Sequence, residues 1–146
     1  MANNSPTMRW PAEVGINHVG AYEVSGRPFA SGNINASTAQ KVDFPFVTRW
    51  VEVINSSNQP VRVGFSLNGV SGNHVDQNYF FVVPKANTSD GGQTSSGRLE
   101  LKISELWLYS PSATTSISVV AGLTSINKNK TSGSLGPSWS GSIGVG

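Results

Sequence analysis

Two histidines and eight acidic residues are the side chains with which this 146-residue chain could carry out acid–base or metal chemistry. His74 and Asp76 lie two residues apart and Asp90 follows further along, so imidazole and carboxylate groups could gather around a cation. The stretch lacks the ordered Asp/Asn–Gly–Glu spacing of a calcium-binding loop. His18 stands alone in a glycine-rich stretch, where a simple hydrogen-bonded role is expected. We therefore predict no metal site.

Nucleophilic catalysis has little support in the sequence. The chain contains no cysteine, which excludes disulfides, thiolate metal sites and cysteine nucleophiles. Serine is abundant but never occurs as Gly-x-Ser-x-Gly, and no glycine-rich stretch joins a strand to a helix as a phosphate-binding loop must. We expect a protein that is not an enzyme and that needs no cofactor.

Aromatic side chains in and around short apolar strands indicate contact surfaces instead. Such rings can point outward as platforms for sugar rings, or they can pack against a loop or another subunit. A tryptophan also occurs in each polar end of the chain. Trp10 could insert into a groove of a neighbouring subunit or cap the domain's own core, and Trp139 belongs to an end that could become ordered against a partner. One arginine, which alternates in step with the buried residues of its strand, is added to these aromatic residues. The candidates for subunit contacts are Trp10, Arg49, Trp50, Trp107, Tyr109 and Trp139.

A predicted hairpin over residues 44–67 organises the elements that must hold these side chains. In its second strand Val61, Val63, Phe65 and Leu67 alternate with polar or small residues. A period of two gives one buried and one solvent-facing side. An isolated hairpin is marginally stable in water, so the rest of the chain has to supply further strands.

The first strand of this hairpin, residues 46–55, should bury Val51 and Val53. Arg49 shares their phase and should therefore point inward, where an unpaired charge is costly. We expect Arg49 to lie near a strand end or a bulge and to pair with an acidic side chain.

Eight short strands separated by uneven loops predict an all-β domain. Charged residues make up only 12% of the chain, about half the usual share, and small polar residues replace them. This pattern favours a two-sheet sandwich, of which the jelly roll is the eight-stranded form. The predicted strands cover residues 21–24, 38–44, 46–55, 61–67, 79–83, 98–103, 105–109 and 116–123.

The same alternation predicts which side chains fill the core. Replacement of Phe65 by alanine should cost roughly 3–5 kcal/mol of stability. Four neighbours should be more exposed to water: Glu52, Arg62, Glu100 and Lys102. The expected core residues are Val51, Val53, Val63, Phe65, Leu99, Leu101, Val119 and Ala121.

Both ends of the chain read as arms outside the domain, which spans residues 14–126. Residues 1–13 are polar with two prolines, and residues 127–146 are rich in Gly and Ser. Such segments bury too little apolar surface to order themselves. We expect an arm that becomes ordered against a partner, and we expect deletion of 127–146 to leave the stability of the sandwich almost unchanged.

Charge and hydropathy argue against two classes of partner. The net charge is only +2, and Lys128 and Lys130 form the single close basic pair, so no nucleic-acid surface is predicted. No apolar run approaches the ~20 residues of a membrane-spanning helix. We expect no direct membrane insertion.

Three short stretches resemble one known family. GINHVGAYEVSGRPFASG, FPFVTRWVEVIN (44–55) and VVAGLTSI (119–126) are similar to the single-jelly-roll penton proteins at the vertices of large icosahedral double-stranded DNA viruses. The resemblance covers about residues 14–126. The C-terminal segment lies outside it, so nothing is carried over to residues 127–146.

The resemblance implies a structural capsid protein. Five copies would form a homopentamer at the fivefold vertex of the virion, in contact with neighbouring major and minor capsid proteins, after assembly in the host cytoplasm. The lack of cysteine fits assembly in a reducing compartment. The alternative is a carbohydrate-binding, lectin-like jelly roll that uses Trp50, Trp107 and Tyr109 as stacking platforms. Oligomeric state separates the two hypotheses, because a ring of five favours the vertex.

Overall fold

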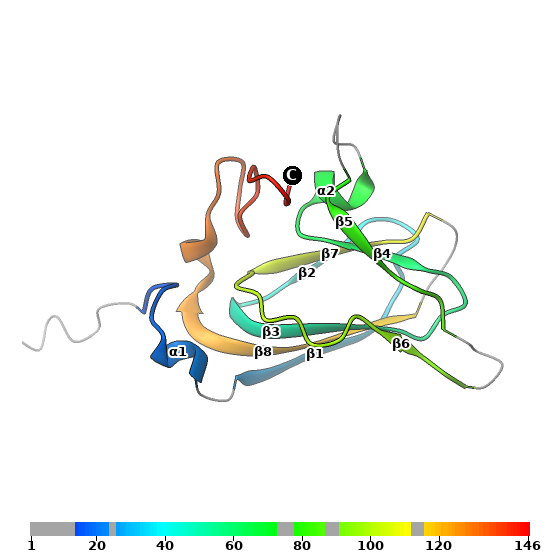
Figure 1. Cartoon of the computed structure of the whole chain (residues 1–146), viewed down its shortest axis with the longest axis horizontal. Helices are drawn as coiled ribbons and strands as arrows, with labels where there is room; N and C mark the ends of the chain where they lie inside the picture. The colour runs from blue at the N-terminus through cyan, green and yellow to red at the C-terminus, as the bar shows by residue number, and fades with distance from the viewer. Residues whose placement is uncertain (1–13, 24–25, 73–77, 87–90, 112–115) are drawn as a thin grey trace, which may run out of the picture.

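The protein is an all-β sandwich of two antiparallel sheets, as the sequence predicts (Figure 1). The computed structural model describes residues 14–23, 26–72, 78–86, 91–111 and 116–146. One sheet has the strand order β1-β8-β3-β6 and the other has the order β2-β7-β4-β5. The strands are β1 Arg27–Ile34, β2 Gln40–Asp43, β3 Phe46–Asn55, β4 Val61–Gly64, β5 Phe80–Val83, β6 Thr94–Ser95, β7 Glu105–Tyr109 and β8 Ile117–Asn127.

Strand pairing is nested along the chain. The first strand pairs with the eighth, the second with the seventh, the third with the sixth and the fourth with the fifth. Successive pairs alternate between the two sheets, so each half of the chain crosses repeatedly from one sheet to the other. This arrangement brings β3 and β8 together as central strands of one sheet.

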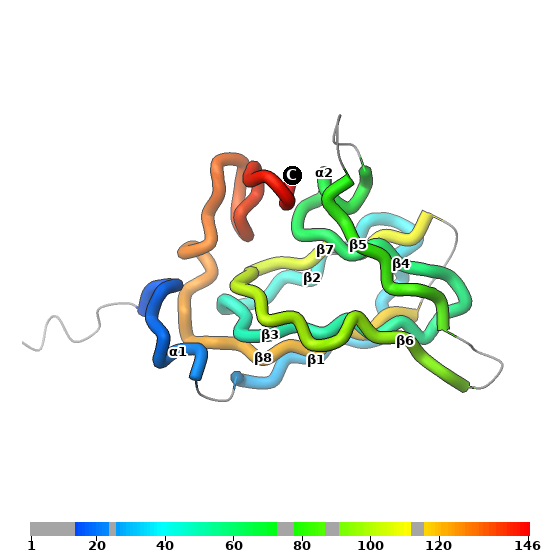
Figure 2. Tube along the Cα trace, viewed as in Figure 1, coloured from blue at the N-terminus to red at the C-terminus, as the bar shows by residue number. Residues whose placement is uncertain are grey.

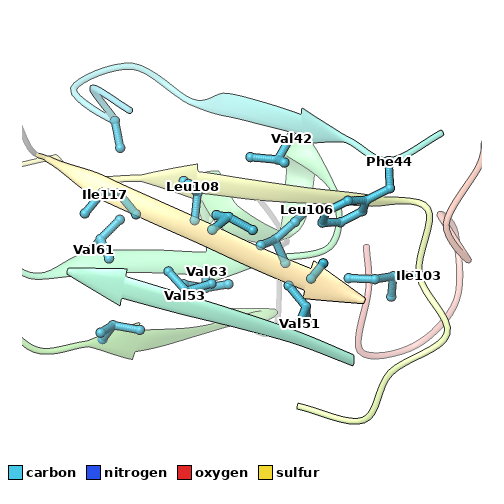
Figure 3. Close-up of a cluster of buried hydrophobic side chains, with 14 of the residues drawn as sticks. Val42, Phe44, Val51, Val53, Val61, Val63, Ile103, Leu106, Leu108 and Ile117 are labelled. Atoms are coloured by element: carbon cyan, nitrogen blue, oxygen red, sulfur yellow. The ribbon is translucent and has the colours of Figure 1, made fainter. Parts of the chain in front are cut away.

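Apolar side chains from both sheets meet in one core (Figure 3). Five of the eight predicted core residues are buried in the described chain: Val51, Val53, Val63, Val119 and Ala121. Phe65, Leu99 and Leu101 are only partly buried and pack against the edge of the core. Phe44 is fully buried and contacts Phe29 edge to face, with 4.9 Å between ring centroids.

Two predicted strands are wrong. The predicted strand 21–24 is replaced over residues 21–23 by the single-turn helix α1 Gly20–Glu23, and residue 24 lies outside the described residues. Hydrogen bonds from Ala21 and Tyr22 to the carbonyls of His18 and Val19 fix this turn. Residues 98–103 form no strand, and Leu99 alone among them makes a bridge, with Val51.

The strand β1 was not among the predicted strands, because glycine and proline residues interrupt the sequence in and before it. Its pairing with β8 shifts register between Ser31 and Ile34, and Asn33 has a positive φ of 55°. Asparagine tolerates this left-handed conformation better than most residues. The irregularity hides the period of two that would have predicted the strand.

The second strand of the hairpin stops earlier than predicted. β4 ends at Gly64, and a short helix, α2 Leu67–Ser71, follows. The hydroxyl of Ser66 accepts a hydrogen bond from the amide of Gly69, as an N-cap does. Leu67 consequently lies on the surface, with 49% of its area exposed, instead of in the core.

β3 contains the irregularity expected at Arg49. Its pairing with β8 shifts register between Phe46 and Thr48 and again between Thr48 and Trp50. Val47 and Thr48 are both buried, so two successive side chains face inward at this bulge. Arg49 is thereby turned away from the core centre.

The C-terminal segment differs from the expected free arm. β8 continues to Asn127, a 3-10 helix η4 covers Lys128–Thr131, and the chain then folds back over the sandwich (Figure 2). Residues 127–146 end near α2, where the Ser66 hydroxyl donates to the carbonyl of Val145 over 2.6 Å. Residues 1–13, the predicted N-terminal arm, lie outside the described residues.

Candidate subunit interface

The candidate contact residues lie on several surfaces of the sandwich. Trp50 is half-buried on the outer face of the β1-β8-β3-β6 sheet, since its neighbour Val51 points into the core. Trp107 and Tyr109 lie on the outer face of the other sheet, since they alternate along β7 with the buried Leu106 and Leu108. The outer faces of a sandwich point in opposite directions. The structure therefore separates Trp50 from the other two rings.

Trp50 lies over a glycine on the neighbouring strand. A Cβ atom added at Gly122 would lie 2.9 Å from Cδ1 and Cε2 of Trp50, so the ring occupies the space that a side chain would need. The guanidinium of Arg98 lies 5.2 Å from the ring centroid, and Arg98 also pairs with the exposed carboxylate of Glu100 over 2.9 Å. These contacts hold the indole flat against its own sheet.

Trp107 and Tyr109 also have intramolecular partners. The indole Nε1 of Trp107 donates to the carboxylate of Glu105 over 2.7 Å. The guanidinium of Arg62 lies 5.7 Å from the Tyr109 ring and 4.4 Å from the ring of Phe80. Cation–π contacts of this kind fix both ring and cation.

Arg49 binds a backbone carbonyl in place of the expected acid. Its Nε donates to the carbonyl of Tyr22 over 2.5 Å. The Tyr22 hydroxyl donates to the carbonyl of Ile16 over 2.7 Å, and the ammonium of Lys102 lies 5.1 Å from the Tyr22 ring. Burial raises the pKa of Tyr22 above its ordinary value of 10.0. Arg49 thus attaches the segment around α1 to the first half of β3.

Buried hydroxyl groups attach the C-terminal segment to the sandwich. Thr131 and Ser138 have no exposed area, and the hydroxyls of Ser104 and Thr131 lie 2.9 Å apart. The Ser138 hydroxyl accepts from the amides of Ser104 and Glu105 over 3.2 and 3.3 Å. Buried hydroxyls that are bonded in this way hold their segment in one position.

Trp139 adds an apolar anchor to the same segment. Its ring packs against the core cluster, and its Nε1 donates to the carbonyl of Lys102 over 2.5 Å. Ser138 and Trp139 have positive φ angles of 56° and 65°, which are unfavourable for residues other than glycine. The packing and the buried hydrogen bonds offset this backbone strain.

This fixed segment presents apolar side chains to solvent. Ile143 is 93% exposed and Leu135 is 73% exposed. They line one shallow pocket together, and Leu135 shares a second pocket with Leu67 of α2. We call Leu67, Leu135 and Ile143 the C-terminal patch. Leu135 and Ile143 lie in the Gly/Ser-rich end that was predicted to be an arm, whereas the alternation in residues 61–67 predicted Leu67 on the buried side of a strand.

The described residues contain no cluster of side chains that matches the metal site considered from the sequence. Among those residues, no three His, Asp or Glu side chains are close enough to hold a metal ion. His74, Asp76 and Asp90 lie outside the described residues, as does Trp10. Within the described ranges, no helix is long and apolar enough to cross a membrane.

Known proteins give no further guide to function. No protein-family model matches the chain, and a search of curated proteins finds none that matches it. The expected resemblance to penton proteins is therefore supported only by the short motifs at 15–32, 44–55 and 119–126. Function has to be argued from the exposed surfaces.

Proposed function

We propose that this protein is a single-jelly-roll capsid protein, five copies of which form the vertex of an icosahedral virion. The observation that carries the proposal is the C-terminal patch. Leu135 and Ile143 are largely exposed, yet the segment that bears them is fixed. Contiguous apolar groups on a rigid surface are typical of interaction sites.

Self-association would remove these side chains from water. Burial of a Leu or Ile side chain contributes about 1.5–3 kcal/mol. Because the segment is already attached through Thr131, Ser138 and Trp139, little further ordering entropy opposes its docking. A preformed apolar patch of this kind favours assembly over a free monomer.

A ring of five needs two different patches on each subunit, since cyclic contacts of this type are heterologous. The outer face of the β1-β8-β3-β6 sheet offers the second patch. Val120 of β8 pairs with Glu52 of β3, and Trp50 and Ile54 lie two residues to either side of Glu52 on the same face, all three apolar residues being half-buried in the monomer. The one acid between them, Glu52, accepts a hydrogen bond from Ser95 over 2.7 Å.

The strand order supports the jelly-roll part of the proposal. Eight strands that pair as first with eighth, second with seventh, third with sixth and fourth with fifth match the two interlocked Greek keys of that fold. The proposal includes neighbouring major and minor capsid proteins as partners and the virion as the location. It includes no enzyme activity, cofactor or nucleic-acid contact.

The carbohydrate-binding strip is the less favoured alternative. It requires Trp50, Trp107 and Tyr109 to lie along one surface, but Trp50 faces away from the other two. Each ring is also held by a partner within the chain. No continuous aromatic platform is formed by these three residues.

A mass measurement on purified protein tests the role of the patch. The wild-type chain should form particles of five times the 15.4 kDa subunit mass as its concentration rises. The double variant Leu135→Ser, Ile143→Ser should remain monomeric over the same range. Val82→Ser is the matched control, because Val82 is 50% exposed but belongs to β5, outside the patch. Equal assembly of the double variant and the wild type would contradict the proposal.

A further inference from the structure

An open pocket of about 370 Å³ lies where the outer face of the β2-β7-β4-β5 sheet meets α2 and the C-terminal segment. Glu105, Trp107 and Lys41 come from the sheet. Ser66, Leu67 and Asn68 come from the start of α2, and Leu135, Pro137 and Ser140 come from the C-terminal segment. Its volume falls within the range of small-molecule sites.

Glu105 is the unusual residue of this pocket. It is only 6% exposed, although glutamate is rarely buried without a charged partner. One carboxylate oxygen, Oε2, accepts from the indole Nε1 of Trp107 over 2.7 Å. Within the described residues, no hydrogen bond or ion pair satisfies the other oxygen. A buried carboxylate with spare acceptor capacity is costly unless a further donor reaches it.

The C-terminal segment fixes this residue in place. The Ser138 hydroxyl accepts from the Glu105 amide and donates to the Glu105 carbonyl, both over 3.3 Å. Across the strand pair, Lys41 lies opposite Trp107, which brings an ammonium to the same face. The pocket is therefore preformed: its acid, its ring and its wall are all held by other contacts.

The charges and surfaces of the pocket select one class of ligand. Lys41 disfavours a cation and Glu105 disfavours an anion. The hydroxyl groups of a neutral polyol can donate to Glu105 and accept from Lys41. They can also donate to or accept from the side-chain amide of Asn68. The indole and the rim leucines suit the apolar face of a sugar ring. We infer that this pocket binds a single pyranose unit, either free or at the end of a glycan.

This inference does not require the pentamer, although the rim residues Leu67 and Leu135 also belong to the C-terminal patch. It also differs from the aromatic strip. It uses one ring, Trp107, together with a buried carboxylate and a wall from the C-terminal segment. The sequence signal was limited to Trp107. Glu105 and the contribution of residues 135–140 could be found only after the fold brought them together.

Nuclear magnetic resonance of the indole N–H groups tests the site directly. The probes are glucose, galactose, mannose and N-acetylglucosamine, each as free sugar and as methyl glycoside, added to full-length ¹⁵N-labelled protein. The Trp107 signal, assigned from Trp107→Phe, should shift on titration with at least one sugar. The signals of Trp50 and Trp139 should not. Binding of free sugars but not glycosides would assign the pocket to free sugars, and glycoside binding would assign it to glycan ends.

Three variants separate binding from folding. Glu105→Gln should weaken binding about tenfold, the effect expected when a hydrogen bond loses its charge. Lys41→Met changes an exposed side chain and should also weaken binding while the spectrum stays that of the folded protein. Trp50→Phe, on the opposite face, should bind as the wild type does.

Two results would overturn the inference. The first is a Trp107 signal that no sugar shifts even at high millimolar concentration, or one that titrates in Lys41→Met and Glu105→Gln with the same affinity as in the wild type. The second is a shift on addition of propylammonium chloride but not of sugars, which would make the pocket a cation site.

Discussion

Phe44 and Phe65 show how burial, rather than residue type, sets the cost of a substitution. Phe44 is fully buried and packs edge to face on Phe29, whereas Phe65 is partly buried and lines an open apolar pocket. Phe44→Ala should therefore lower the free energy of unfolding by about 3–5 kcal/mol. Phe65→Ala should cost only about 1–2 kcal/mol, less than alternation alone predicts.

Urea unfolding at one fixed protein concentration measures both values, since assembly would otherwise shift apparent stability. The slope of the free energy with urea should stay constant between the two variants. Equal losses for Phe44→Ala and Phe65→Ala would mean that Phe65 belongs to the core after all.

Gly122 is required by the ring that lies over it. Gly122→Ala would bring a methyl group into the Trp50 indole, and overpacking of this kind costs about 1–3 kcal/mol. In a Trp50→Ala background the same change should cost almost nothing. The double-mutant cycle should thus give a clear coupling energy between the two sites.

Gly32→Ala is the control for this cycle. A Cβ there would lie 3.5 Å from the Ser118 hydroxyl, an ordinary contact, so no loss beyond a few tenths of a kcal/mol is expected. Additive effects of Gly122→Ala and Trp50→Ala would contradict the arrangement of the ring.

At the scale of elements, the regular strands were predictable and the irregular ones were not. The spans 46–55 and 105–109 were predicted with their exact bounds, because Val51 and Val53 in one and Leu106 and Leu108 in the other keep a period of two, even though β3 is bulged before Trp50. β1 contains a positive φ and a register shift, and β6 has two residues. Such segments depend on tertiary pairing, which local pattern does not record.

The candidate surfaces were only partly predictable for a related reason. Alternation indicated that Trp50 and Trp107 point outward, but strand order decides that they face opposite ways. The Gly/Ser-rich composition of 127–146 predicted a free arm, whereas Thr131 and Ser138 are buried and bonded. Hydroxyl residues look alike in sequence whether water or the protein satisfies them.

The C-terminal segment should therefore contribute to stability. Truncation after Asn127 removes the Trp139 packing and the buried hydroxyl network, so it should lower the free energy of unfolding by at least about 2 kcal/mol. This reverses the expectation from composition, which was that the sandwich would scarcely be affected. Thermal unfolding of monomeric samples measures the difference.

Single variants show whether the hydroxyl network is responsible. Ser138→Ala leaves the amides of Ser104 and Glu105 without their acceptor and should cost about 1–3 kcal/mol. Ser134→Ala alters an exposed position in the same segment and should have no measurable effect. If the truncated chain melts together with the wild type, the segment is not part of the folded domain.

At the scale of the whole molecule, one apolar patch and one apolar sheet face lie on different sides of the sandwich. The C-terminal patch extends from α2 to Ile143, and Trp50, Ile54 and Val120 lie on the outer face of the β1-β8-β3-β6 sheet. In Figure 1, α2 and the C-terminal segment lie at the top of the view and this sheet lies at the bottom. Contact between two unlike patches generates a ring or a filament instead of a twofold dimer. The proposed vertex role requires that this ring close at five subunits.

Electron-microscopy class averages of the concentrated wild-type protein test that requirement most directly. The proposed function predicts closed rings with fivefold symmetry, and it predicts their absence from images of the Leu135→Ser, Ile143→Ser variant. Stable twofold dimers, open filaments or monomers alone in the wild-type images would contradict it.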